Sequence, residues 1–196
     1  MNDAVTTEWP GHADEALLAE CHRVVAAVVG LGGAVGWLDV PDRSDVDAWL
    51  LGVVDRVAAG TAGLLVVRAA GRVEGLGTWV ANPPGTKAVV TDLQRIMVHP
   101  DARGLGLGRI LVDLLTGAAL GAGAEVVTLA VRGNNHGAVA LYEACGFRIW
   151  GVLPGGVAVG DERYDDVRMY RAAPLPDHLV RHGSNPTGLG SSAVRS

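Results

Sequence analysis

The chain has 196 residues, of which 49% are hydrophobic and 19% charged, and its formal net charge is −5. This length suits one domain, and the apolar content is sufficient for a large core and too high for a disordered chain. The 16 basic residues include a single Lys and none is adjacent to another, so a clustered basic face for nucleic acid is not expected.

Cysteine content and the N-terminal residues exclude further classes. Cys21 and Cys145 are the only cysteines, which fits neither a disulfide scaffold nor a cysteine-based zinc site. The first ten residues contain acidic but no basic side chains, so no signal peptide is predicted. The longest uncharged run, residues 24–38, contains glycines and is shorter than the roughly 20 residues that span a bilayer. We therefore expect a cytoplasmic protein that binds neither nucleic acid nor membrane.

The N-terminal part of the chain predicts two helices after an unpatterned start. Residues 1–12 show no periodicity. Apolar residues from Asp14 to Val29 recur at helical spacing. Ser44, followed by an acid three residues later, predicts the N-cap of a second helix that ends near Ala59.

The period then changes to that of strands. Residues 63–70 and 73–80 flank Gly71 and predict a β-hairpin. A loop at 82–85 separates this hairpin from a third strand at 88–98.

The second half of the chain alternates helices and strands. Amphipathic patterns predict helices at 107–121 and 135–145, the latter ending before Gly146. Between them, the near-continuous apolar run 125–131 is typical of a strand buried on both faces. Two more strands are predicted at 147–153 and 166–170.

This element order predicts one α/β (or α+β) domain with a mixed sheet over residues 1–173. Residues 174–196 are rich in Pro, Gly and Ser. We interpret them as a mobile C-terminal extension rather than an ordered arm.

A glycine-rich loop follows the third strand of this scheme. The segment from Arg103 to Arg109, RGLGLGR, lies between a predicted strand and a predicted helix. Unpaired backbone N–H groups and the helix dipole would converge there, which suits a phosphate, although a plain glycine-rich turn is the alternative. A Walker loop is excluded because the only lysine, Lys87, lies elsewhere.

A second motif, from Asn135 to Phe147, has the pattern N-x-x-A-x-x-L-Y-x-x-x-G-F. Together with R-x-x-G-x-G at 103–108 and the preceding Val98-His99-Pro100, it closely resembles the GNAT N-acetyltransferase superfamily. The resemblance covers residues 62–171. The usual first strand of that family is not evident near the N-terminus.

The resemblance implies a fold and a ligand. The fold would be a mostly antiparallel, twisted sheet flanked by helices, with splayed central strands that bind acetyl-CoA. The backbone N–H of Val98 would polarise the thioester carbonyl, and Asn135 would either contact acetyl-CoA or cap its own helix. The full set of implied acetyl-CoA-binding residues is Met97, Val98, Arg103, Gly104, Leu105, Gly106, Leu107, Gly108, Arg109 and Asn135.

Two residues are candidates for catalysis by the same resemblance. Tyr142 matches the family tyrosine that donates to the leaving sulfur, where a phenol would stabilise the thiolate without ionising itself, but its helical face also suits the core. Asp92 would accept the proton of the amine directly or through water, or it is a solvated carboxylate at a strand end. Gln94 shares the strand face of Asp92 and is a candidate substrate contact.

No metal is expected. His178 and His182 have helical spacing, but no third ligand lies nearby in the sequence. His99 is interpreted as a turn residue rather than a catalytic one.

The leading hypothesis is an acetyl-CoA-dependent N-acetyltransferase that acts on a small-molecule or peptide amine. The alternative is a non-catalytic acyl-CoA-binding or regulatory module on the same fold. The net charge mildly favours a cationic acceptor. Dimers are common among similar proteins, so a homodimer is a candidate assembly.

Overall fold

A seven-stranded sheet forms the centre of the molecule in the computed structural model, which describes residues 5–33, 35–174 and 179. The strand order is β1-β2-β3-β4-β5-β7-β6, and every neighbouring pair is antiparallel except β4 and β5. The strands are β1 (Thr6–Glu8), β2 (Ala62–Ala69), β3 (Arg72–Ala81), β4 (Val90–Val98), β5 (Val126–Arg132), β6 (Arg148–Val159) and β7 (Glu162–Ala172). The predicted mixed, mostly antiparallel sheet is thus confirmed.

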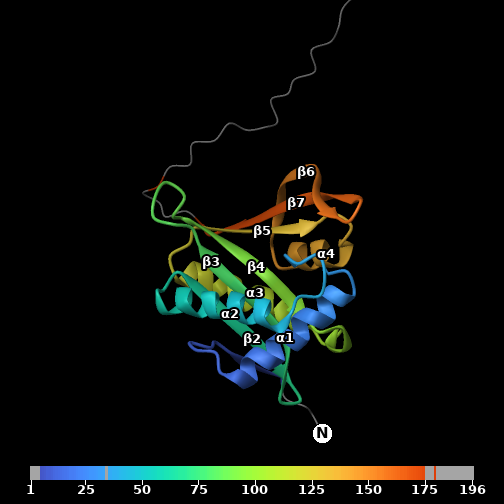
Figure 1. Cartoon of the computed structure of the whole chain (residues 1–196). Helices are drawn as coiled ribbons and strands as arrows, with labels where there is room; N and C mark the ends of the chain where they lie inside the picture. Colours follow the sequence, from blue (N-terminus) through green and yellow to red (C-terminus); the bar gives the residue numbers. More distant parts are fainter. Residues whose placement is uncertain (1–4, 34, 175–178, 180–196) are drawn as a thin grey trace, which may run out of the picture.

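Four helices cover the two faces of this sheet (Figure 1). α1 (Glu15–Gly30) and α2 (Arg43–Ala58) pack on one face, and α3 (Leu107–Gly121) and α4 (His136–Ala144) pack on the other. A short 3₁₀ turn, η1 (Pro100–Ala102), connects β4 to the glycine-rich loop.

The side chains of β2 show why the sheet is apolar on both faces. Leu64 and Val66 pack into the core under α1 and α2, whereas Leu65 and Val67 pack into the core under α3. Alternate residues of a strand point to opposite faces, so a strand between two helical layers needs an unbroken apolar run.

The helix boundaries follow the predictions closely, with one correction. The carboxylate of Asp14 accepts a hydrogen bond from the N–H of Leu17 at 2.8 Å and caps α1. Ser44 was predicted as the N-cap of α2, but the cap position is Asp42 and the helix already includes Arg43. An ion pair of 2.7 Å between Arg43 and Asp47, one turn apart, favours this earlier start.

The N-terminal segment contains a strand that the sequence pattern does not reveal. β1 pairs antiparallel with β2, with Thr6 opposite Arg68 and Glu8 opposite Val66. The first strand that was not evident from the sequence is therefore present. β1 has three residues, all exposed, and so lacks the apolar alternation that identifies longer strands.

The last two strands are longer than predicted. β6 extends to Val159 and β7 begins at Glu162, so the two form a long hairpin rather than two short strands. The register shifts between Leu153 and Val157, next to Gly155 and Gly156. Most β6 side chains are exposed, which removes the pattern that marks buried strands.

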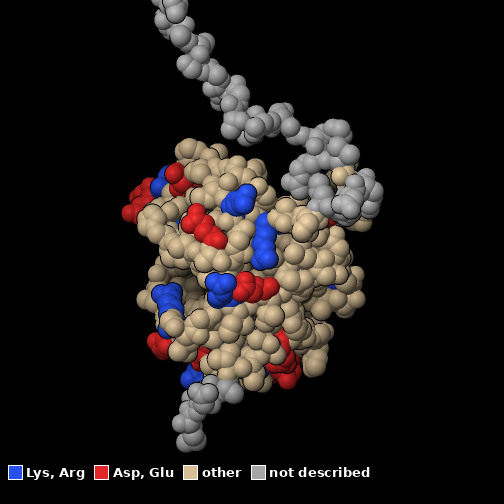
Figure 2. Space-filling model, turned by 180° about the vertical axis from the view of Figure 1, so that it is seen from behind, with Lys and Arg blue, Asp and Glu red and all other residues tan. Residues whose placement is uncertain are grey.

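Some predictions fall outside the described residues. These are the interpretation of residues 175–178 and 180–196 as a mobile tail and the His178–His182 pair. Within the described part of the chain, no helix is long and apolar enough to cross a membrane. Lys and Arg side chains on the face shown in Figure 2 are interspersed with acidic and uncharged residues.

Candidate functional site

The central feature of the sheet is the point where β4 and β5 separate. These parallel strands pair at Val90–Val126, Thr91–Val127 and Asp92–Thr128, and their pairing ends there. β4 continues beside β3 to Val98, and β5 continues beside β7 to Arg132. Beyond Asp92 the two strands therefore leave a V-shaped opening in the sheet.

A distortion in β4 accompanies this separation. Arg95 has a φ of 53°, which is rare for a residue with a side chain, and the β3–β4 register shifts between Leu76 and Thr78. A bulge of this kind bends a strand and redirects its side chains.

A cleft of about 990 Å³ occupies the opening. Its walls come from β4, the glycine-rich loop, the start of α3, the end of β5, α4 and the loop between α1 and α2. All of the predicted acetyl-CoA-binding residues line it except Leu105, whose side chain lines a second hollow of about 660 Å³. The structure thus brings the two sequence motifs together across one cavity.

The glycine-rich loop presents a row of free backbone donors. Gly104 and Gly106 have φ values of 82° and 77°, the left-handed conformation that glycine adopts without strain. Within the described residues, the N–H groups of Gly104 to Gly108 have no hydrogen-bond partner in the protein. These five groups lie at the start of α3, so the helix dipole adds to the attraction for an anion.

Two arginines flank this row. Arg103 and Arg109 line the cleft, and Arg109 also contacts Asp113 at 3.3 Å one turn along α3. No acidic residue lies in the first turn of α3. Backbone donors, the dipole and two guanidinium groups therefore fit a diphosphate at this position.

The backbone of β4 offers one more donor to the cleft. The N–H of His99 donates to the carbonyl of Glu74 on β3 at 2.8 Å. Backbone groups of successive residues in a strand point to opposite sides, so the N–H of Val98 points away from β3 and toward the opening. The same alternation turns the backbone groups of Met97 toward β3, which leaves Val98 as the better-placed donor.

Tyr142 belongs both to the core and to the cleft. Its side chain is 9% exposed, contacts Phe147 edge-to-face with ring centroids 6.1 Å apart, and lines the cleft. Burial, with a smaller effect of Cys145, raises the pKa of Tyr142 to about 12. The phenol therefore stays protonated at neutral pH, and the two alternatives for this residue are compatible.

Asn135 caps α4. Its side-chain oxygen accepts a hydrogen bond from the N–H of Ala138 at 3.1 Å, which establishes the capping role. Because Asn135 also lines the cleft, its contact with acetyl-CoA stays a prediction.

Asp92 lies at the base of the opening rather than on its wall. Its Oδ1 accepts a hydrogen bond from the hydroxyl of Thr128, across the last paired position of β4 and β5. Gln94 lines the cleft, and Asp92 does not. Among the described residues no Asp or Glu lines the cleft at all, so the role of Asp92 as a base stays a prediction.

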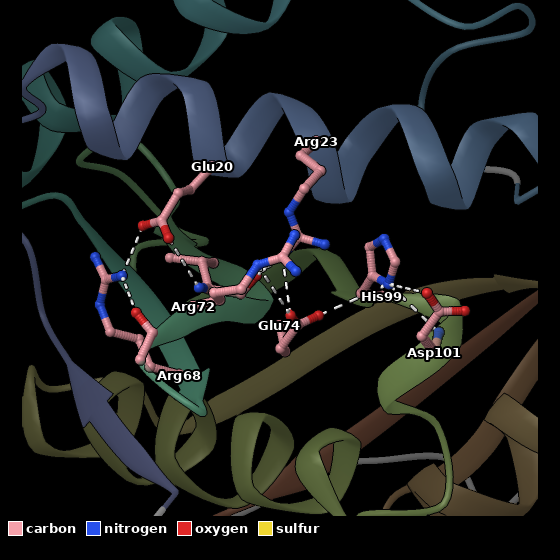
Figure 3. A network of polar contacts seen from close by, with 9 residues as sticks. Glu20, Arg23, Arg68, Arg72, Glu74, His99 and Asp101 are labelled. Atoms are coloured by element: carbon pink, nitrogen blue, oxygen red, sulfur yellow. Dashed lines mark hydrogen bonds and ion pairs between the residues drawn. The ribbon is translucent and has the colours of Figure 1, made fainter. Parts of the chain in front are cut away.

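A network of charged residues holds the turn that leads into the glycine-rich loop (Figure 3). Glu74 contacts Arg23 of α1 at 3.1 Å and Nδ1 of His99 at 3.7 Å. His99 Nδ1 also accepts a hydrogen bond from the N–H of Asp101 at 3.3 Å. These contacts connect the end of β4 to α1 and β3, and they place His99 in the turn rather than in the cleft.

Sequence reasoning missed two arginines of the cleft, Arg95 and Arg132. Arg95 interrupts an apolar strand, and Arg132 ends the buried strand β5. The sequence signal that could have identified them is a charged residue in or at the end of a buried strand, because such a side chain needs a partner or access to water.

Comparison with known proteins agrees with this geometry. The molecule combines a splayed mixed sheet with a row of backbone donors at a helix N-terminus, an arrangement that suits an anionic ligand. The model of the acetyltransferase (GNAT) family matches residues 34–147, more than half of the chain. The protein belongs to the GNAT acetyltransferase family.

The match to an individual relative is shorter than the match to the family model. A mycothiol acetyltransferase of Geodermatophilus obscurus is 40% identical over 68 residues, which cover 34% of this chain and 22% of that protein. This chain therefore corresponds to only a small part of that relative.

Two solved structures share the fold. A ribosomal-protein-alanine N-acetyltransferase from Brucella melitensis has a TM-score of 0.72 and 23% identity, covering 87% of this chain and 99% of that chain. A phosphinothricin acetyltransferase from Sinorhizobium meliloti, solved in complex with acetyl-CoA, has a TM-score of 0.71 and 21% identity, covering 88% and 89%.

Proposed function

We propose that the protein is an acetyl-CoA-dependent N-acetyltransferase that transfers the acetyl group directly to a primary amine of a small molecule or a protein. The observation that carries this proposal is the row of free N–H groups from Gly104 to Gly108, between Arg103 and Arg109. Acetyl-CoA carries a diphosphate, which is the anion that this row suits. Family membership supports the same ligand.

The transfer needs an acceptor for charge on the carbonyl oxygen and a donor for the sulfur. The amine nitrogen attacks the thioester carbon, the C–N bond forms and the C–S bond breaks. The N–H of Val98 is the group that would stabilise negative charge on the oxygen. Tyr142 would donate a hydrogen bond from its phenol to the leaving thiolate, and its raised pKa keeps the phenol protonated while it does so.

The proton of the attacking amine has no carboxylate acceptor on the cleft wall among the described residues. Water in the cleft would then be the direct acceptor, and Asp92, held by Thr128 at the base of the opening, would receive the proton through it. The same lack of a lining carboxylate favours the alternative of a non-catalytic acyl-CoA-binding module.

Turnover separates these two functions. The protein is mixed with saturating acetyl-CoA and a panel of primary amines, and release of the CoA thiol is followed. We expect release that depends on amine and ceases after denaturation of the protein. Acetyl-CoA binding without release for any amine would instead assign the non-catalytic function.

A further inference from the structure

Arg95 and Arg132 lie on the same face of the splayed sheet. Leu129 and Val131 of β5 pack into the core under α3, so the alternating residue Arg132 lies on the opposite face, the side of α1 and α2. There its Nη2 donates to the carbonyl of Gly32 at 2.9 Å. The guanidinium carbon of Arg95 lies 3.8 Å from the ring centroid of Trp37, in the loop between α1 and α2.

Neither arginine has an acidic partner among the described residues. Nη1 of Arg95 and Nε of Arg132 are buried and make no hydrogen bond to that part of the chain. Both side chains line the main cleft. Aromatic rings hold the two guanidinium groups in place. The guanidinium carbon of Arg95 also lies 4.7 Å from the ring centroid of Trp49, and that of Arg132 lies 4.9 Å from the ring centroid of Tyr164.

The carboxylates on this face are engaged elsewhere. Asp92 accepts a hydrogen bond from Thr128, and Asp166, directly opposite Arg132 in the β5–β7 register, pairs with Arg168 at 2.7 Å. A partly buried guanidinium without a counter-ion is costly, and an anion from a ligand would offset that cost.

We propose that Arg95 and Arg132 bind a carboxylate of the acceptor, so that the substrate is an amine that carries its own carboxylate, such as an amino acid. This inference rests on the proposed transferase function and specifies its substrate class. It also reverses the expectation of a cationic acceptor, because the charge of the cleft wall acts on the substrate at much shorter range than the net charge of the whole chain.

The test compares acceptors that differ only in the carboxylate. CoA release is measured with the twenty standard L-amino acids, β-alanine and 4-aminobutyrate, and then with the carboxamide of each reactive acid. O-phosphoethanolamine serves as the phosphate-bearing amine. We expect at least one amino acid to react, its carboxamide to have a KM at least tenfold higher, and O-phosphoethanolamine to react less well than that acid.

Variants locate the effect. Arg95→Gln and Arg132→Gln should each raise the KM for the acid about tenfold or more, leave the KM for the carboxamide within about twofold, and leave acetyl-CoA affinity unchanged. Arg56→Gln, an exposed residue in the last turn of α2, is the matched control and should change none of these values. The acid–carboxamide comparison on the unmodified protein stands even where a variant fails to fold.

The outcomes separate the two proposals. If acetyl-CoA does not bind, the proposed transferase function is contradicted, and the proposed substrate class is contradicted with it. Three other results would overturn the substrate class alone. These are turnover of amines without any preference for a carboxylate, no reaction with any acid of the panel, and a faster reaction with O-phosphoethanolamine.

Discussion

The side chain of Tyr142 shows how one residue can serve the core and the reaction. Its ring is packed against Phe147, and its hydroxyl forms no hydrogen bond with any described residue. Loss of the ring would leave a cavity, whereas loss of the hydroxyl alone leaves the packing intact. The hydroxyl can therefore be tested separately from the fold.

Replacement of Tyr142 by Phe should lower kcat at saturating acetyl-CoA by about 10- to 100-fold, because the departing thiolate loses its hydrogen-bond donor. The Kd for acetyl-CoA should stay within about twofold, since the ring remains. Steady-state CoA release and a binding titration on the same preparation give both values. A kcat equal to that of the unmodified protein would assign Tyr142 to the core alone.

At the scale of elements, the glycine-rich loop depends on backbone geometry more than on side chains. Gly106 is the N-cap of α3 with a φ of 77°, and it precedes two of the five free N–H groups. A side chain at this position is strained, and relief of that strain would move the N–H groups that the proposed diphosphate needs.

Gly106→Ala should therefore destabilise the protein by about 1–2 kcal/mol and weaken acetyl-CoA binding at least tenfold. Gly117→Ala is the matched control, because Gly117 lies on the exposed side of the same helix and a Cβ there meets no atom within 4 Å. It should stabilise the protein by about 0.5–1 kcal/mol and leave binding unchanged. Urea denaturation and calorimetric titration measure both effects. Equal acetyl-CoA affinity for the two variants would contradict the assigned role of the loop.

Elements with strong periodicity were predictable from the sequence, and elements set by tertiary contacts were not. α3 begins and ends at the predicted residues, because its apolar stripe lies between glycine-rich segments. β1 and most of β6 are exposed and were missed or shortened. The cofactor motifs predicted one wall of the cleft, whereas Arg95 and Arg132 emerged only once the splay of β4 and β5 was known.

At the scale of the whole molecule, buried proton donors tie stability to pH. Burial raises the pKa of Cys21 from 9.0 to about 12, and that of Tyr142 from 10.0 to about 12. The folded protein keeps these protons at pH values where the unfolded chain releases them. Their contribution to stability is thus complete below about pH 9 and is lost as the pH rises toward 12.

The free energy of unfolding should consequently fall by a few kcal/mol between pH 9 and pH 12. Between pH 7 and pH 8.5, the titration of these two groups should change the free energy of unfolding little. Urea denaturation across this range measures the decline. Cys21→Ala should begin from a lower stability and show a smaller alkaline decline. A decline of the same size in this variant would rule out Cys21 as a source of the effect.

The central claim is that the free N–H groups at the start of α3 bind the diphosphate of acetyl-CoA. Calorimetric titration with acetyl-CoA and, separately, with S-acetylpantetheine, which lacks the diphosphate, tests it most directly. We predict saturable binding of acetyl-CoA and at least tenfold weaker binding of S-acetylpantetheine, because charge-assisted hydrogen bonds to the loop are lost. No binding of acetyl-CoA, or equal affinity for both ligands, would contradict the account.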